Sequence, residues 1–239
     1  MVVTAPSADA DVRALENPVW SSVTGAHAGL ADVRSVGHGR AGRYQTDVAP
    51  FGALEDPADP ACWEALAELL DGHATCLLIE PADLAPGWEV VAVIPGVQMD
   101  GTGLAPAADP GAVTLTEADV PEMLDLVERT RPGPYLRRTI RMGPYLGIRH
   151  DGDLIAMAGQ RLHPSGWAEI SAVCTDPRHR AQGLGTRLVR AVAENIRSGG
   201  ERPFLHAAAD NTGAIRLYEA LGFTLRRTLS FTVVRRRRP

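Results

Sequence analysis

An arginine and two glycines stand close together where a predicted strand gives way to a predicted helix. They are Arg180, Gly183 and Gly185, in the segment RAQGLG. The first turn of a helix has backbone N–H groups without partners inside the helix, and the helix dipole adds partial positive charge there. Glycines let a ligand approach this backbone closely, and the arginine can donate charged hydrogen bonds. The segment therefore predicts an anion site suited to a pyrophosphate, although an ordinary tight turn has the same composition.

Two familiar phosphate-binding patterns do not fit this segment. The chain has no Gly-Lys-Ser/Thr of a Walker-type loop, and GLGTRL (183–188) lacks the third glycine of a dinucleotide-binding turn. The choice between an anion site and a plain turn therefore needs support from elsewhere in the chain.

One carboxylate and one histidine lie in predicted strands nearby. Glu169 interrupts an otherwise apolar strand, where partial burial would raise its pKa towards that of a useful base, although it could also sit near an exposed strand end. His206 is a second basic group, but a lone histidine in a strand is more often a hydrogen-bonded core residue. Cys174 fits a small core residue better than a nucleophile, because no base is evident beside it.

The second half of the chain contains the elements that must position these residues. The sequence predicts a strand and a capped helix over 113–133, a second short helix near 134–143 and a hairpin about an Asp-Gly turn. A further strand ends near Thr175, a helix begins close to Gly183, and strand, helix and strand follow. The order β-α-α-β-β-β-α-β-α-β predicts an α/β (α+β) fold, a mixed sheet with helices on both faces.

The first half is less regular. DPADPACWEALAELLDG predicts a helix capped by Asp59, and two strands follow it. A Gly-, Ala-, Pro- and Asp-rich stretch, 99–113, predicts a linker. The expected domains are a smaller α/β half over residues 1–105 and a second domain over residues 113–239.

Composition argues against several classes of protein. The chain has 239 residues and a formal net charge of −5, which argues against a general nucleic-acid binder, and the basic run Arg235–Arg238 suits a solvated tail. Three cysteines without metal-like spacing predict free thiols in a reducing cytoplasm and no metal. The N-terminus lacks a secretory pattern, and no apolar run approaches the ~18 residues of a membrane span. We expect a soluble cytoplasmic protein without a membrane partner, and a homodimer stays open.

Two segments together resemble the GNAT superfamily of acyl-CoA-dependent N-acyltransferases. RAQGLG (180–185) matches its [Q/R]-x-x-G-x-[G/A] signature, and NTGAIRLYEALGF (211–223) matches its N-x-x-A-x-x-x-Y-x-x-x-G-F segment. The similarity covers roughly residues 113–234 and implies a GNAT-type mixed sheet there. The first half has neither segment, and one interpretation is a degenerate GNAT-like lobe that packs on the active half.

The resemblance implies acetyl-CoA as co-substrate, bound in a gap between two splayed parallel strands. The strand before the loop would pair with the pantetheine arm, the loop amides would hold the pyrophosphate, and Asn211 would reach the pantetheine. Ala181 stands where the family often has glycine, which is tolerated if its φ is negative. We expect the second half alone to bind acetyl-CoA. The residues expected at the coenzyme are Val173, Cys174, Thr175, Arg180, Ala181, Gln182, Gly183, Leu184, Gly185, Thr186, Asn211 and Ala214.

The implied reaction is the attack of a primary amine on the acetyl carbonyl in a ternary complex, with the coenzyme thiolate leaving. Tyr218 matches the family's tyrosine near the sulfur and is the expected general acid, with a core tyrosine as the alternative. Glu169 lies eleven residues before Arg180, the spacing of the glutamate base in histone-acetylating members, so Glu169→Gln would erase the acidic limb of the pH profile. Water and His206 stay open as the base.

The acceptor is a small amine or a peptide amine that the sequence does not identify. Tyr135, Arg137, Arg138 and Arg141 follow the first helix and could bind an anionic acceptor, or the arginines could be a solvated helix face. The alternative to an N-acetyltransferase is a non-catalytic acyl-CoA-binding regulatory or interaction module.

Overall fold

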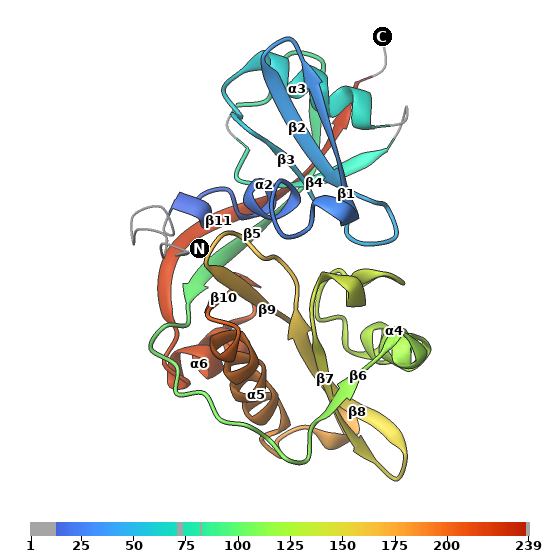
Figure 1. The fold of residues 1–239 in the computed structure, drawn as a ribbon, viewed down its shortest axis with the longest axis vertical. Coiled ribbons are helices and arrows are strands. Elements are labelled where there is room, and N and C mark those ends of the chain that lie inside the picture. Colours follow the sequence, from blue (N-terminus) through green and yellow to red (C-terminus); the bar gives the residue numbers. More distant parts are fainter. Residues whose placement is uncertain (1–12, 71–73, 82, 238–239) are drawn as a thin grey trace, which may run out of the picture.

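The computed structural model describes residues 13–70, 74–81 and 83–237 (Figure 1). Most of the N-terminal stretch that bears on a secretory signal, and Arg238 of the basic run, lie outside these residues. Within the described ranges, no helix is both long and apolar enough to span a membrane. The same residues contain no group of three or more His, Cys, Asp or Glu side chains arranged to hold a metal ion.

An eight-stranded mixed sheet forms the centre of the molecule, in the order β4-β11-β5-β10-β9-β8-β7-β6. Strands β9 and β10 are parallel, and the other neighbouring pairs are antiparallel. The predicted mixed sheet with helices on both faces is confirmed. The strands are β4 (Thr75–Ile79), β5 (Trp88–Asp100), β6 (Val113–Leu115), β7 (Tyr145–His150), β8 (Asp153–Gln160), β9 (Trp167–Thr175), β10 (Arg202–Ala208) and β11 (Thr224–Arg236).

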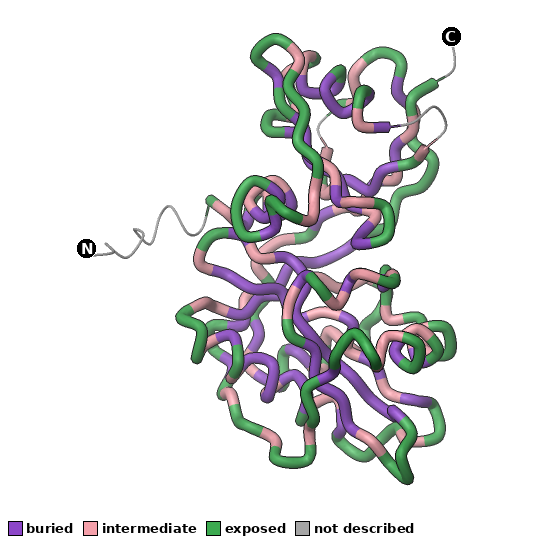
Figure 2. Tube along the Cα trace, turned by 45° about the vertical axis from the view of Figure 1, so that its right-hand side comes forward, coloured by how far each residue is buried: buried purple, intermediate pink, exposed green. Residues whose placement is uncertain are grey.

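Helices cover both faces of this sheet because alternate strand residues point to opposite sides. Met123 of α4 (Val120–Thr130) packs in one buried cluster with Met157 of β8. Leu188 of α5 (Leu184–Ser198) packs in another cluster with Ala156, which directly precedes Met157 in β8 and so points to the opposite face. Helix α6 (Thr212–Ala220) lies on the α5 side, and the strands between the helices are the most buried part of the chain (Figures 1 and 2).

The connections of the second half differ from the prediction at one point. The Asp-Gly hairpin is confirmed, since β7 pairs with β8 and the turn residues Asp151 and Gly152 have φ values of 50° and 92°. The second short helix after α4 is only a 3₁₀ turn, Thr139–Met142. Three prolines and two glycines lie within the segment 132–144, and these residues interrupt a regular α-helix.

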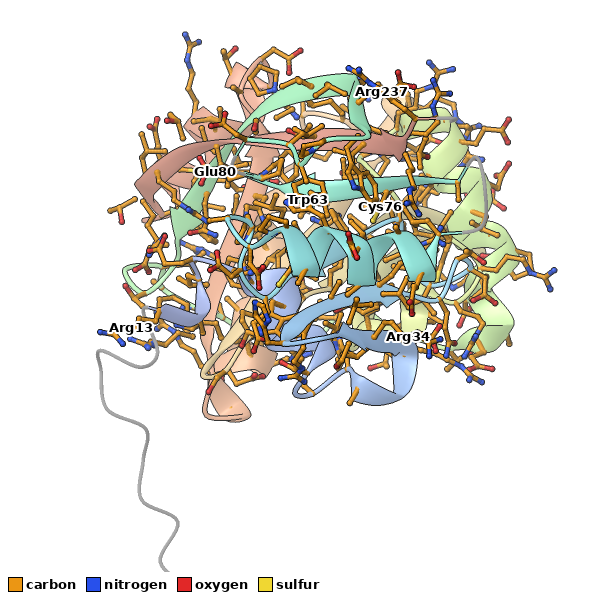
Figure 3. All side chains as sticks on the ribbon, turned by 90° about the horizontal axis from the view of Figure 1, so that it is seen from above. Arg13, Arg34, Trp63, Cys76, Glu80 and Arg237 are labelled. Atoms are coloured by element: carbon orange, nitrogen blue, oxygen red, sulfur yellow. The ribbon has the colours of Figure 1, made fainter. Side chains whose placement is uncertain are left out.

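A smaller three-stranded antiparallel sheet lies in the first half. Its strands are β1 (Ala31–Val36), β2 (Gly39–Tyr44) and β3 (Gly52–Leu54), accompanied by the helix α2 (Pro18–Val23). The predicted helix is present as α3 (Pro60–Leu69), with the Asp59 side chain accepting a hydrogen bond from the backbone N–H of Ala61. Seen from above in Figure 3, α3 lies between β1 and β4, and Trp63 and Cys76 share its buried cluster. The remaining short turns are the 3₁₀ helices Ala28–Leu30, Glu117–Asp119 and Pro177–His179.

The two halves share their longest strands. The end of β5 pairs with β10, from Gly96 opposite Ala208 to Asp100 opposite Phe204, and so lies inside the sheet of the second half. The end of β11 pairs in return with β4 of the first half. Between them, β5 and β11 pair with each other along most of their length. A fragment that begins at residue 113 would lack the strand between β10 and β11, so the expectation that the second half acts alone needs revision.

Each half repeats one order of elements. In the second half, the antiparallel strands β7, β8 and β9 are followed by α5 and by β10, which is parallel to β9. In the first half, the antiparallel strands β1, β2 and β3 are followed by α3 and by β4. Leu77 of β4 forms a parallel bridge with Phe51, the residue directly before β3. In each half the last of these strands then pairs with a long strand from the other half, β10 with β5 and β4 with β11.

The basic run at the C-terminus is not a free tail over its first residues. Arg235 and Arg236 belong to β11, and Nε of Arg235 donates to Oε1 of Glu89 at 2.9 Å. The expectation of a solvated tail is therefore wrong for these two residues, because strand pairing with β5 orders them.

Candidate functional site

The predicted anion loop lies directly before α5. Gly183, the residue before the helix, has a φ of 72° in the left-handed region, and an added Cβ there would meet nothing within 4 Å. Within the described part of the chain, no group accepts a hydrogen bond from the backbone N–H of residues 183–186. A helix N-terminus with free N–H groups and open space in front of it is the arrangement that binds phosphate oxygens.

Ala181 does not meet the condition under which alanine is readily tolerated in this loop. Its φ is 60° and not negative. An L-residue in this conformation costs about 1 kcal/mol, and the surrounding loop must offset that cost. The loop is held by the buried Asp176, which accepts hydrogen bonds from the backbone N–H and the guanidinium of Arg178 at 2.9 and 3.1 Å. Arg129 of α4 lies 3.3 Å from the other carboxylate oxygen. The Asp-Pro pair after β9 is the only sequence signal for this anchor.

A cavity runs from the loop towards the sheet, and we call it the coenzyme cavity. Its lining includes every residue predicted to contact the coenzyme except Gln182. It lies beside the part of β9 that has separated from β10, because these strands pair only from Trp167 opposite Arg202 to Glu169 opposite Phe204. Beyond that point β10 continues beside β5, and β9 continues beside β8.

Strand β9 is also bent at the gap, a feature that the sequence analysis missed. Ala172 has a φ of 51°, and the pairing of β8 with β9 shifts register between Met157 and Gly159. Such a bulge leaves strand backbone groups unpaired and redirects them. Nothing in the apolar run around Ala172 signals it.

Asn211 and Tyr218 lie on the far wall of the coenzyme cavity. The side-chain oxygen of Asn211 accepts the backbone N–H of Ala214 at 3.2 Å and caps α6. No described residue accepts from its side-chain nitrogen, so this group can face a ligand. The hydroxyl of Tyr218 has no hydrogen-bond partner among the described residues, and burial raises the pKa of Tyr218 to about 12. The hydroxyl therefore keeps its proton at neutral pH.

Cys174 lines the same cavity but does not suit a nucleophile. Its side chain is buried, and burial raises the pKa of the Cys174 thiol to about 11. The thiolate, which is the nucleophilic form, is therefore scarce at neutral pH.

A second cavity joins the first, and we call it the acceptor cavity. It shares Arg131, Val173, Asn211 and Tyr218 with the coenzyme cavity. Its other walls come from β9, β10 and β11, from Arg161 just after β8, and from Phe51, Leu77 and Ile94 of the first half. The site is therefore built by both halves, with Tyr218 on the wall that the two cavities share.

Glu169 does not line either cavity. Its side chain is fully buried and accepts hydrogen bonds from Nε and Nη2 of Arg161 at 2.9 and 2.7 Å. Burial alone would raise the pKa of Glu169, but Arg161 and His206 outweigh it and hold that pKa well below its usual range. The expectation of a raised pKa is therefore wrong, because no sequence pattern indicated Arg161, which directly follows β8, as the partner of Glu169.

His206 is also engaged on both sides of its ring. Nδ1 lies 2.8 Å from Oε1 of Glu169, and Nε2 lies 3.0 Å from Nε2 of Gln98. Gln98 accepts from Arg226 through its oxygen and donates to the carbonyl of Leu15 through its nitrogen, which fixes its orientation. His206 therefore accepts at Nε2 and donates from Nδ1 to Glu169, and neither nitrogen is free to take a proton from an amine.

We predict that Glu169→Gln will destabilise the fold by about 3–5 kcal/mol, because it leaves a buried guanidinium without its carboxylate. The pKa of Glu169 is lower in the folded chain than its ordinary value of 4.5. The ion pair of Glu169 with Arg161 therefore stabilises the fold fully above pH 4.5, and this stabilisation is lost progressively as the pH falls below 4.5. Urea unfolding at pH 7 and pH 4 measures both effects, with the exposed Glu117→Gln as control. Unchanged stability, together with loss of the acidic limb of kcat/KM, would restore Glu169 as the base.

The arginines after α4 lie elsewhere. Arg138 donates to Gln45 at 2.8 Å and pairs with Asp47 at 3.1 Å, and Arg141 pairs with Glu117 at 2.9 Å. Tyr135 is buried and its hydroxyl donates to Sδ of Met123. Neither these groups nor Arg137 line the acceptor cavity. Arg137, Arg138 and Arg141 instead line a separate cavity together with residues of α4, and their role at an acceptor stays a prediction.

The chain is similar to known acetyltransferases. The FR47-like protein family matches residues 145–232. A solved acetyltransferase of the GNAT family from Novosphingobium aromaticivorans is 41% identical, with a TM-score of 0.82 and coverage of 94% of this chain and 99% of that chain. A mycothiol acetyltransferase from Sanguibacter keddieii is 32% identical over 163 residues, 65% of this chain and 50% of the relative. The N-alpha-acetyltransferase RimI from Mycobacterium tuberculosis is 34% identical over 82 residues, 33% of this chain and 51% of the relative.

The chain spans about half the length of these two curated relatives, 50% and 51%. The solved relative, by contrast, is matched over nearly its whole length at 41% identity. The order of strands and helices and the free helix N-terminus agree with this similarity. As the two sequence segments predicted, the chain belongs to the GNAT family of acetyltransferases.

Proposed function

We propose that the chain transfers the acetyl group of acetyl-CoA directly to a primary amine in a ternary complex. The observation that carries this proposal is that two joined cavities share Tyr218 in their lining. One cavity leads to free backbone N–H groups that suit a pyrophosphate, and the other admits a second molecule. Two joined cavities with a protonated phenol in their shared lining suit direct transfer.

Each residue has a proposed role in this reaction. The amides of residues 183–186 hold the pyrophosphate, the backbone of β9 near Val173 pairs with the pantetheine arm, and the side-chain nitrogen of Asn211 reaches it. As the amine nitrogen bonds to the acetyl carbon and the carbon–sulfur bond breaks, Tyr218 donates its proton to the departing sulfur. We assign removal of the amine proton to water, because Glu169 and His206 are held by each other and by neighbouring side chains.

We also propose that the first half is a degenerate copy of the second. The repeated order of elements supports this, and so does the N-terminus of α3. There the Asp59 carboxylate caps the helix, where it would repel a phosphate. The β1–β2 turn also closes this end, since a Cβ on Gly39 would lie 2.3 Å from the backbone of Ala61. One coenzyme site per chain follows.

A cytoplasmic location and a homodimer remain proposals. The cysteines of the described residues are all free and buried, which suits a reducing compartment. Strand β5 exposes Val90 and Val93 where it pairs only with β11, and an apolar strand edge of this kind can pair with a second copy.

Release of free thiol from acetyl-CoA over a panel of amines tests the enzymatic proposal. We expect amine-dependent thiol release and an equal amount of N-acetylated product by mass spectrometry. Tight binding of acetyl-CoA by calorimetry, with no thiol released for amino acids, polyamines, aminoglycosides or peptide N-termini, would instead support a non-catalytic acyl-CoA-binding module.

A further inference from the structure

Arg161 is a buried cation that uses only part of its guanidinium. Its side chain is 9% exposed, and Nε and Nη2 both donate to Glu169. No described residue accepts a hydrogen bond from Nη1, although Arg161 lines the acceptor cavity. Its guanidinium carbon lies 5.0 Å from the ring centre of Phe51, which holds the group in place. A charged donor with little access to water gains from a hydrogen bond to a ligand, so an oxygen atom of a ligand is favoured at Nη1.

The charge of the cavity limits what that ligand can be. Glu169 neutralises Arg161, and the described residues that line the acceptor cavity include no aspartate or glutamate. A second ammonium group on the acceptor would therefore find no anion there. A polyamine or an aminoglycoside does not fit this cavity, whereas a molecule with one amine and an uncharged or anionic oxygen does.

The walls limit the rest of the ligand. Phe51, Leu77, Ile94, Ile170 and Phe231 line the acceptor cavity with apolar surface. Arg131, which directly follows α4, lines both cavities and is exposed to solvent. An apolar group of the acceptor can bury against these side chains, while a carboxylate near the junction of the cavities can reach Arg131.

Resting on the proposed function, we propose that the acceptor is an α-amino acyl group with an apolar side chain, H₂N–CHR–C(=O)–. Arg161 binds the carbonyl or carboxylate oxygen through Nη1 and so directs the adjacent amine towards the acetyl group. The amine nitrogen gains the acetyl carbon, the sulfur loses it, and the proton lost by nitrogen balances the one gained by sulfur. Free amino acids and peptide N-termini both contain this group.

Three matched amines separate the parts of this proposal in the wild-type protein. Leucine, leucinamide and 3-methylbutylamine share one alkyl group, and the last lacks the oxygen. An amine beside a carbonyl loses its proton at lower pH than an alkylamine, so kcat/KM is calculated on the concentration of neutral amine. We expect leucine or leucinamide to exceed 3-methylbutylamine by about 10-fold to 100-fold, the size of one hydrogen bond to a charged group.

The outcomes of this comparison are distinct. A preference for leucinamide points to peptide N-termini, and a preference for leucine points to free amino acids, with Arg131→Gln then lowering leucine turnover more than leucinamide turnover. An advantage of less than about 10-fold over 3-methylbutylamine, or faster turnover of spermidine, overturns the inference and leaves the proposed acetyltransferase standing. Thiol release with none of these amines, spermidine included, overturns both.

Arg161→Lys tests the residue itself. Lysine keeps the charge opposite Glu169 but lacks the planar fork that places Nη1 in the cavity. We expect it to reduce the preference for the α-amino acyl compounds to about threefold or less, while the Kd of acetyl-CoA stays within about threefold. A preference that survives in a variant with unchanged acetyl-CoA affinity would overturn the role of Arg161.

Discussion

Gly183→Asp is expected to abolish binding of acetyl-CoA. The substitution places a carboxylate at the residue before α5, beside the free N–H groups proposed to hold the pyrophosphate. The carboxylate both competes for these donors and repels the diphosphate across a few ångströms of partly desolvated space. Isothermal titration calorimetry should give one site per chain for the wild type and at least a 100-fold weaker Kd, or no heat, for the variant.

Gly183→Asn is the matched control for this experiment. Asparagine has the size of aspartate and tolerates the left-handed backbone that Gly183 adopts, so both variants pay a similar conformational cost. We expect the Asn variant to bind within about 10-fold of wild type. Equal affinity for the Asp variant and the wild type would remove the pyrophosphate site from this loop, and equal losses in both variants would assign the effect to backbone strain.

The local part of the site could be predicted from sequence because it is made by short contiguous segments. RAQGLG fixes the loop before α5, and Asn211 and Tyr218 lie seven residues apart on one helix, so their relative positions follow from helix geometry. The cavity that these segments line contains the predicted coenzyme residues with one exception, Gln182. Which of them contact acetyl-CoA stays a prediction.

The long-range part could not be predicted. Nothing in the valine-rich stretch of β5 says that it pairs with β10 rather than within its own half, because pairing partners are a property of the whole sheet. Arg161 directly follows β8 and Glu169 lies eight residues later on β9, and only the pairing of these two segments brings them together. The pKa of Glu169 was misjudged for that reason, since burial without the partner has the opposite effect. The positive φ of Ala181 likewise could not be predicted from the residues of the loop alone.

Tyr218→Phe is expected to lower kcat by about 10²-fold while the Kd of acetyl-CoA changes by less than about threefold. Phenylalanine keeps the ring, which packs 5.7 Å from the ring of Phe223, and removes only the hydroxyl that has no partner in the described structure. The lower kcat is therefore expected to reflect weaker stabilisation of the transition state, in which the sulfur develops negative charge. Because the pKa of Tyr218 is about 12, the wild-type hydroxyl stays protonated through the neutral range, and no basic limb below about pH 10 should depend on it.

The control for this variant is Tyr135→Phe. Tyr135 is likewise buried, but its hydroxyl donates to Sδ of Met123 and it lines neither of the two joined cavities. The same atom is removed there without any expected effect on kcat, so a comparable loss in both variants would indicate a general effect of deleting a buried hydroxyl. Single-turnover thiol release at saturating acetyl-CoA measures the chemical step directly. Wild-type rates in Tyr218→Phe would make Tyr218 a packing residue and would leave protonation of the sulfur to water, as proposed for the amine.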